Sequence, residues 1–211
     1  MKIEIISLER DLKRRCRCLM LQKQNQQINI FNAIDCKNTE QIKKLCEDNK
    51  IISSLSPHNA CTLSHITILK NFIKSDQPYI IILEDDCILL QNLPNCDNDI
   101  DNMLKDINTD YENTDILYLT ERIHFNKNYE VTHAIGTEGY IVTKHGAEKI
   151  IEATYYEEIP IDWIIEAYCV YGRQSIRDRI NNRKPHIKIR AFKSKTPFVT
   201  CDFTLESNII G

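Results

Sequence analysis

The chain contains an unbroken apolar run, Tyr79 to Leu83, that is followed directly by three acids, Glu84, Asp85 and Asp86. A run of β-branched and aromatic residues without polar alternation is typical of a strand covered on both faces, as in a parallel α/β sheet. Ligands of such sheets bind beyond the carboxyl ends of the strands. This junction therefore predicts an α/β fold with a functional site where the strand ends.

The three acids also predict a site for a divalent metal ion. Adjacent carboxylates repel one another unless they share a cation, and Mn²⁺ and Mg²⁺ prefer oxygen ligands. In an extended chain Glu84 and Asp86 point to one side and Asp85 to the other. We expect Asp86 as the main metal ligand, with Glu84 beside it. The alternative is a solvated acidic turn.

Length, hydropathy and cysteine spacing limit the class of protein to which the chain can belong. The 211 residues can form one sizeable core, so we expect a single domain over residues 1–211. No apolar stretch approaches the ~20 residues of a membrane span, and the first residues predict a strand instead of a signal peptide. The nine cysteines include no C-x-x-C pair, so we expect free thiols in a reducing cytoplasm.

Charge is distributed unevenly along the chain. Residues 76–121 hold a dozen acids and one cation, Lys105, whereas residues 173–195 hold nine cations and one acid, Asp178. The basic segment predicts an anionic partner: a diphosphate, a phosphorylated glycan or an anionic membrane surface. Nucleic acid is disfavoured because the segment lacks interleaved aromatic residues. The alternative is a solvated basic loop.

Predicted strands and helices alternate along the chain, which indicates a layered α/β sheet. The expected strands cover residues 3–8, 28–33, 79–83, 116–119, 133–143 and, as an exposed or edge strand, 187–192. We expect Thr39 and Thr143 to cap helix starts and Gly172 to end a helix in a left-handed conformation. No glycine-rich phosphate loop is present, so a bound nucleotide would need a metal to neutralise its phosphates.

Six short segments occur in an order that matches a known family. They are Ile6 to Arg10 with Arg14 and Arg15, Phe31 to Asp35, Cys61 to Ile66, Ile82 to Asp86, Gly136 to Tyr140 with Gly146 to Lys149, and Pro160 to Trp163. Together they resemble glycosyltransferase family 25, the lipooligosaccharide galactosyltransferases of Gram-negative bacteria and their collagen-modifying relatives. The chain departs from the family at Pro57 and Ala60, where glycines are usual.

The resemblance implies a GT-A type, Rossmann-like mixed sheet flanked by helices. It also implies a nucleotide-sugar donor, usually UDP-galactose, a divalent metal at the acidic motif, and transfer with inversion. We therefore expect an enzyme that moves a hexose onto a bacterial surface glycan or glycolipid such as lipooligosaccharide, in the cytoplasm and peripherally at the inner membrane. Two alternatives are a nucleotide-sugar phosphohydrolase and a catalytically silent nucleotide-sugar-binding protein.

The resemblance also implies two sets of binding residues. The donor set is Ser7, Arg10, Arg14, Ser64, His65, Glu84 and Asp85. The acceptor set is Gly136, Thr137, Tyr140 and Trp163. Arginine suits a diphosphate because its planar fork pairs two oxygens at once. The alternatives are a structural role for His65 on its helix and a solvated Arg14 or Arg15.

Inverting transfer needs a base that accepts the proton of the acceptor hydroxyl. Asp162 is the first candidate, because it lies at a predicted helix start beside Pro160 and Trp163. The alternative for Asp162 is a helix N-cap. Glu138 is the second candidate for the base, since it stands between two glycines that would allow a ligand to approach closely.

Overall fold

The computed structural model describes residues 1–51, 56–134, 136–157, 159–180 and 184–205. Its centre is a six-stranded sheet in the order β2-β1-β3-β8-β5-β9. The strands are β1 (Lys2–Ser7), β2 (Ile28–Asn32), β3 (Tyr79–Glu84), β5 (Ile116–Tyr118), β8 (Gly139–Thr143) and β9 (Ala191–Lys193). Within this sheet β8 pairs antiparallel with β3 and β5, and the other pairings are parallel. The predicted α/β class, a mixed sheet flanked by helices, is confirmed.

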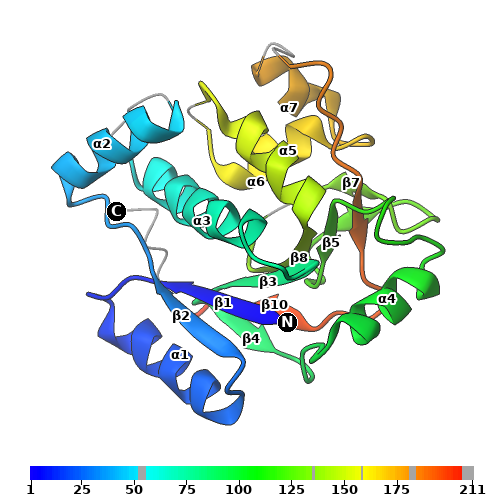
Figure 1. Ribbon diagram of the computed structural model, residues 1–211, viewed down its shortest axis with the longest axis horizontal. Helices are drawn as coiled ribbons and strands as arrows, with labels where there is room; N and C mark the ends of the chain where they lie inside the picture. Colours follow the sequence, from blue (N-terminus) through cyan, green and yellow to red (C-terminus); the bar gives the residue numbers. More distant parts are fainter. Residues whose placement is uncertain (52–55, 135, 158, 181–183, 206–211) are drawn as a thin grey trace.

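Helices cover both faces of the sheet (Figure 1). One face packs against α3 (Pro57–Ile73), α5 (Lys144–Thr154) and α6 (Ile161–Tyr168), with α2 (Thr39–Asn49) beside α3 and α7 (Gln174–Arg179) beside α6. The other face packs against α1 (Leu12–Gln24) and α4 (Asp97–Asp106). Along β3, Ile80 and Ile82 join the first core and Ile81 and Leu83 the second. Burial on both faces explains why this strand has no polar alternation.

Two small antiparallel sheets of two strands each accompany the main sheet. One pairs β4 (Cys87–Leu89) with β10 (Val199–Cys201), and the other pairs β6 (His124–Phe125) with β7 (Val131–His133). Strand β4 begins directly after the three acids, so β10 brings residues Val199–Cys201 to the same place. There the backbone N–H of Asp202 donates to the carbonyl of Asp86 at 2.7 Å.

Some predicted element ends are confirmed and others are wrong. Thr143 caps α5 as predicted, accepting from the N–H of Gly146 at 3.1 Å. Asn38 caps α2 in place of Thr39, because it stands one residue earlier and its side-chain oxygen accepts from the N–H of Gln41. Helix α6 ends at Tyr168 with an extended cap residue, so Gly172 is not its left-handed cap. Gly172 instead packs against the carbonyl of Glu166, where a Cβ would collide.

Two predicted strands also differ. The strand expected over residues 133–143 is divided between β7 and β8, and the strand expected over 187–192 is the shorter β9, which is fully buried at the sheet edge.

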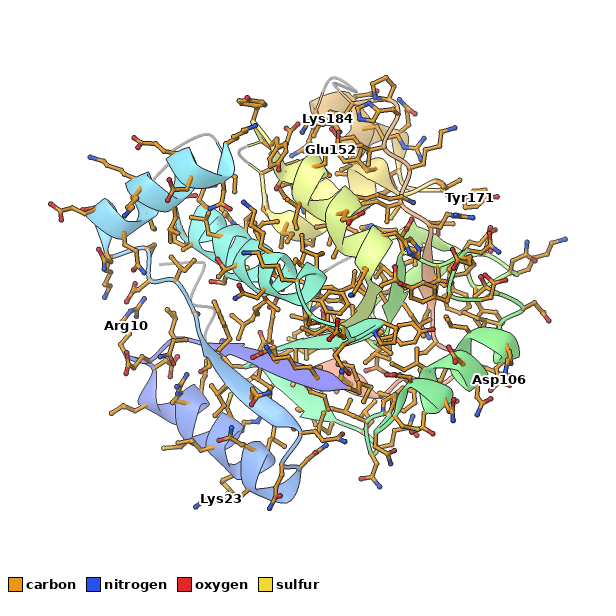
Figure 2. The ribbon with its side chains drawn as sticks, in the orientation of Figure 1. Arg10, Lys23, Asp106, Glu152, Tyr171 and Lys184 are labelled. Atoms are coloured by element: carbon orange, nitrogen blue, oxygen red, sulfur yellow. The ribbon has the colours of Figure 1, made fainter. Side chains whose placement is uncertain are left out.

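The basic segment 173–195 is used largely inside the fold. Six of its nine cations contact other parts of the chain: Arg173, Arg177, Arg179, Lys184, Arg190 and Lys193. Lys184 lies over the end of α5 near Glu152 (Figure 2), where its Nζ donates to the carbonyls of Ala153 at 2.9 Å and Tyr155 at 2.5 Å. Arg183 lies outside the described residues. Among the helices of the described residues, none is long and apolar enough to cross a membrane.

Candidate active site

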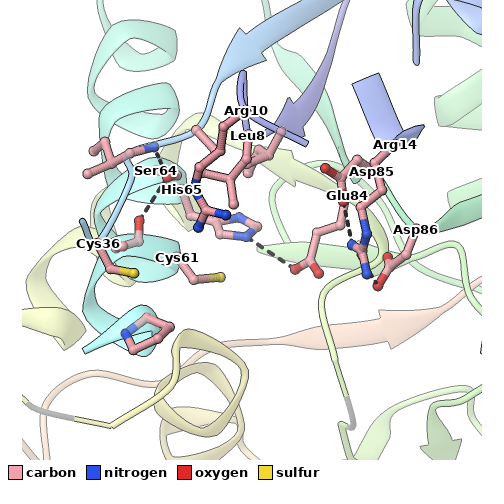
Figure 3. Close-up of a pocket in the computed structure, with 15 residues that line it drawn as sticks. Leu8, Arg10, Arg14, Cys36, Cys61, Ser64, His65, Glu84, Asp85 and Asp86 are labelled. Carbon is pink, nitrogen blue, oxygen red and sulfur yellow. Dashed lines mark hydrogen bonds and ion pairs between the residues drawn. The ribbon is translucent and has the colours of Figure 1, made fainter. Parts of the chain in front are cut away.

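A pocket opens at the carboxyl ends of the three parallel strands β1, β2 and β3, beside the first turns of α3 (Figure 3). This is where ligands bind in sheets of this kind. Its lining residues are Ile6, Leu8, Arg10, Arg14, Ala33, Ile34, Cys36, Pro57, Ala60, Cys61, Ser64, His65, Glu84, Asp85 and Asp86. One wall is therefore apolar and the opposite side carries the three acids.

Asp85 and Arg14 form a buried ion pair on the α1 side of the site. The Arg14 Nη1 donates to Asp85 Oδ1 at 2.6 Å and lies 3.8 Å from Asp86 Oδ2. Both partners of the Arg14–Asp85 pair are nearly enclosed, with side-chain exposures of 8% and 9%. Burial raises the pKa of Asp85, although Arg14 opposes the shift. Arg14 thus pairs with Asp85 and lies near Asp86, whereas Glu84 contacts His65 and Thr137 on the α3 side.

On the α3 side Glu84 is held by the Thr137 hydroxyl and lies against His65. The Thr137 hydroxyl donates to Glu84 Oε1, and His65 Nε2 lies 3.3 Å from the same oxygen. Burial alone would raise the pKa of Glu84, but the neighbouring His65, Thr137 and Arg14 outweigh it and lower the pKa. The other ring nitrogen, Nδ1 of His65, lies 2.9 Å from the Tyr140 hydroxyl. Tyr140, predicted to contact the acceptor, is instead fully buried behind His65.

Asp86 has a strongly perturbed carboxyl group. Burial and the charges of Glu84, Asp85 and Glu138 raise the pKa of Asp86 to about 7, although Arg14 opposes this. Among the described residues its Oδ1 finds no hydrogen-bond partner, although the atom is buried. A buried carboxylate oxygen without a partner is open to a group that the chain itself does not supply, such as an ion or a water molecule.

Glu138 faces the same region from the other side of the β3–β8 pair. The N–H of Glu84 donates to the carbonyl of Glu138 at 3.2 Å, which joins the two strands. The Glu138 side chain is only 2% exposed, and its Oε1 accepts from Arg122 Nη1 at 2.9 Å and from the Thr120 hydroxyl at 3.3 Å. Burial raises the pKa of Glu138 in spite of Arg122.

Asp162 lies in a second cleft that meets the first. This cleft is lined by His58, Cys61, Glu84, Gly136, Thr137, Pro160, Ile161 and Asp162, so the two clefts share Cys61 and Glu84. Asp162 Oδ2 accepts from the N–H of Gly136 at 3.1 Å. Gly136 has φ +82°, a left-handed conformation that favours glycine. Burial, and then the charge of Glu84, raise the pKa of Asp162.

The N-cap alternative for Asp162 does not hold. Pro160 occupies the N-cap position of α6, and Asp162 is the second residue of the helix. Its carboxylate holds the loop before β8 through Gly136 and also interacts with the backbone amides of Asp162 and Trp163 in the first turn of α6.

The remaining predicted residues have varied surroundings. The Ser64 hydroxyl accepts from the N–H of Ile34 at 2.9 Å and donates to the carbonyl of Ala60 at 2.8 Å, so it shapes the pocket wall. Ser7 is buried at the end of β1. Arg10 pairs with Asp35 at 2.6 Å and lines the pocket. The guanidinium of Arg179 lies over the ring of the half-buried Trp163, 4.5 Å from the ring centre.

Sequence reasoning missed two residues of the site. Cys61 lines both clefts, and its spacing of four residues from His65 on a predicted helix was a readable signal that they share a face. Arg122 binds Glu138, which lies 16 residues later in the sequence, and no local sequence pattern predicts that contact.

The fold and the site together define an α/β enzyme whose acidic pocket lies at the carboxyl edge of its sheet. The chain belongs to glycosyltransferase family 25 (LPS biosynthesis protein), whose family model matches residues 1–165. The resemblance noted in the sequence is thereby confirmed, and the protein is a glycosyltransferase. The matched region contains both clefts as far as Asp162.

Solved structures with a similar chain path are distant in sequence. A glycosyltransferase involved in glycosylation of the major capsid of PBCV-1 is 10% identical, with 98% of this chain and 95% of that chain covered and a TM-score of 0.41. HddC from Yersinia pseudotuberculosis is 15% identical, with coverages of 94% and 92% and a TM-score of 0.43. An active-site mutant of LgtC is 9% identical, with coverages of 100% and 91% and a TM-score of 0.44. Likenesses this distant assign no residue and no substrate. No curated protein matched the chain.

Proposed function

We propose that this protein transfers a hexose from a nucleotide sugar, with UDP-galactose as the first candidate, to a bacterial surface glycan or glycolipid such as lipooligosaccharide. The transfer inverts the anomeric carbon and depends on Mn²⁺ or Mg²⁺. The observation that carries this proposal is the meeting of the two clefts at Glu84. One cleft holds the acid triplet, and the other holds a buried carboxyl group, Asp162, with a raised pKa.

The nucleotide binds in the pocket at the ends of β1, β2 and β3. Leu8, Ala33 and Ile34 give it an apolar wall for a base, and the acids on the opposite side suit a ribose or the waters around a metal. Arg10 stands on the lining with part of its guanidinium engaged by Asp35, so it can also meet a diphosphate.

The metal belongs with Asp86, and Glu84 stands beside it. The unpartnered Asp86 Oδ1 is a hard oxygen ligand, which fits Mn²⁺ or Mg²⁺. A metal bound there would offset the negative charge that develops on the departing diphosphate. Glu138 adds negative charge close to the same position, which favours a divalent cation over a neutral ligand.

Asp162 is the base. The Gly136 N–H fixes its Oδ2, and the raised pKa of Asp162 suits a group that must accept a proton near neutral pH. The acceptor oxygen forms its bond to the anomeric carbon on the face opposite the leaving diphosphate, and its proton passes to Asp162. Glu138 is the second candidate, disfavoured because Arg122 already binds its carboxylate.

The experiment is turnover with a panel of UDP-sugars and Mn²⁺, with and without glycan acceptors. Asp86→Asn and Asp162→Asn should each lower turnover by ~10²-fold or more, since each removes a group worth several kcal/mol to the transition state. Asp106→Asn, on the exposed side of α4, is the matched control and should leave turnover unchanged. Full activity of Asp86→Asn in EDTA would contradict the metal assignment.

The same panel separates the alternatives. Acceptor-independent hydrolysis would indicate a phosphohydrolase, and binding without turnover a silent binding protein. The anomeric configuration of the product, read by NMR, tests inversion.

We also propose that the enzyme works in the cytoplasm, beside the inner membrane where a glycolipid acceptor presents its sugars. The support is that all nine cysteines are unpaired, as suits a reducing compartment. Thiol titration of the denatured protein without reductant should find nearly all nine free, and two or more protected pairs would contradict this location.

A further inference from the structure

Three potential metal ligands of different chemistry converge on the floor of the donor pocket. Cys61 and His65 lie four residues apart on α3, so they share one face of the helix, and Glu84 reaches them from the end of β3 (Figure 3). One ligand atom from each, a thiol sulfur, a ring nitrogen and a carboxylate oxygen, lies within 4.8 Å of the others. All three residues line the pocket, so an ion between them would be reached from it.

The ring of His65 is already oriented for a metal. Its Nδ1 lies 2.9 Å from the Tyr140 hydroxyl, which can accept the Nδ1–H and leave the lone pair on Nε2. Nε2 is fully buried, makes no hydrogen bond among the described residues, and lies 3.3 Å from Glu84 Oε1. The Thr137 hydroxyl fixes the same carboxylate. Two ligands therefore have supporting partners of the kind that surround metal sites.

The ligand set selects a different ion from the acid triplet. A thiolate, an imidazole and a carboxylate suit Zn²⁺ in a four-coordinate site whose last position stays open, whereas Mn²⁺ and Mg²⁺ prefer oxygen alone. We propose that Cys61, His65 and Glu84 form a Zn²⁺ site whose occupation competes with the nucleotide-sugar donor. On binding, the Cys61 S–H bond is replaced by S–Zn and the proton leaves to solvent.

The competition rests on the proposed function, because it requires that the donor occupies this pocket. A bound Zn²⁺ would take Glu84 away from the donor side and place an ion, with its outer ligand, on the pocket floor. The site itself does not depend on that function, so the two claims are tested separately.

The site is tested by titrating the full-length protein with CoCl₂ as a spectroscopic substitute for zinc. The wild-type protein should show a thiolate-to-cobalt charge-transfer band and the visible bands of a four-coordinate ion. Cys61→Ser and Cys61→Ala should lose the charge-transfer band. Cys36→Ser removes another thiol of the same pocket and is the matched control, which should keep the band.

Affinity is measured with ZnCl₂ against a chromophoric chelator. Cys61→Ser should weaken Zn²⁺ binding by at least ~10-fold, and Tyr140→Phe, which removes the partner of Nδ1 while filling the same space, should weaken it by about 10-fold. Unchanged thermal unfolding of Tyr140→Phe would show that the loss is not one of folding. Two results would overturn the proposed zinc site. One is a wild-type cobalt spectrum without the charge-transfer band, and the other is a band that is lost in Cys36→Ser and kept in Cys61→Ser.

Competition is measured by the binding of UDP with Mn²⁺, before and after one equivalent of ZnCl₂. Zinc should weaken UDP binding at least ~10-fold in the wild type and not in Cys61→Ser. Zinc binding at Cys61 that leaves UDP affinity unchanged would overturn the competition alone. No UDP binding even without zinc would contradict the proposed function and leave the zinc site standing.

Discussion

At the scale of single residues, the site contains several charged side chains that are buried and therefore no longer hydrated. Arg14 and Asp85 illustrate the consequence, because each is the main compensation for the other in a buried place. Removing one partner of such a pair leaves an uncompensated buried charge, whereas removing both can be nearly neutral.

Arg14→Met should therefore lower the free energy of unfolding by about 3–5 kcal/mol, measured by urea denaturation. The double variant Arg14→Met with Asp85→Asn should be clearly more stable than the sum of the two single changes predicts. Lys13→Met, at the exposed neighbouring position, should change stability by no more than about 0.5 kcal/mol. Strict additivity of the two changes would show that the pair is not coupled.

Asp162 makes a prediction about pH. Its pKa in the folded protein is raised, so the folded state binds its proton more tightly than the unfolded chain does. The stability that this proton provides is fully present below the unfolded pKa and is lost as pH rises through the folded pKa. Asp162→Asn should therefore gain stability relative to the wild type as the pH rises above the unfolded aspartate pKa of ~3.9, measured by urea denaturation at each pH. A difference that is constant with pH would contradict the raised pKa.

At the scale of elements, tight contacts at glycine decide where helices can lie. Gly146, in the first turn of α5, packs against the carbonyl of Asp115 just before β5, and a Cβ would collide with that backbone. Alanine ordinarily improves a helix by about 1 kcal/mol over glycine. Here the helix must shift away from the sheet to make room.

Gly146→Ala should accordingly lose about 2 kcal/mol of unfolding free energy or more, measured by thermal and urea denaturation. Glu148→Ala on the exposed side of the same helix should stay within about 0.5 kcal/mol of the wild type. A stabilised Gly146→Ala would mean that α5 does not press on that carbonyl.

Elements were predictable from the sequence where one local pattern dominates. The apolar run of β3 and the hydroxyl of Thr143 before α5 each act within a few residues, and both predictions are confirmed. Contacts across the sheet were not predictable, because nothing local distinguishes Arg122, which binds Glu138, from any other surface arginine. The family resemblance marked Tyr140 but could not show that its side chain turns inward to His65.

At the scale of the whole molecule, the internal use of the basic segment limits what it offers to a membrane. Six of its cations contact the fold, and Lys188 and Lys195 are exposed cations among the remainder. Attraction of a surface cation to anionic lipid is worth about 1 kcal/mol or less and is screened by salt.

Lys188→Glu with Lys195→Glu should reduce sedimentation with phosphatidylserine vesicles several-fold at low salt, and binding of the wild type should vanish at high salt. Lys43→Glu with Lys44→Glu, an exposed pair on α2, makes the same change of net charge and should have the smaller effect. Equal losses from both pairs would show that net charge, and not the basic segment, governs the contact.

The two clefts of the site are formed largely by different stretches of the sequence, which meet at the antiparallel strand β8. The pocket is made by residues no later than Asp86, and the Gly136, Thr137 and Asp162 side of the neighbouring cleft comes from a separate later stretch. The two stretches meet where β3 pairs with β8 and where α3 packs on α5 and α6. Recombination between related genes could therefore exchange one half and keep the other. A chimera would need to match its parents along that seam and where β10 and Asp202 contact β4 and Asp86, so a single genetic event can combine the acid pocket of one parent with the Asp162 side of another.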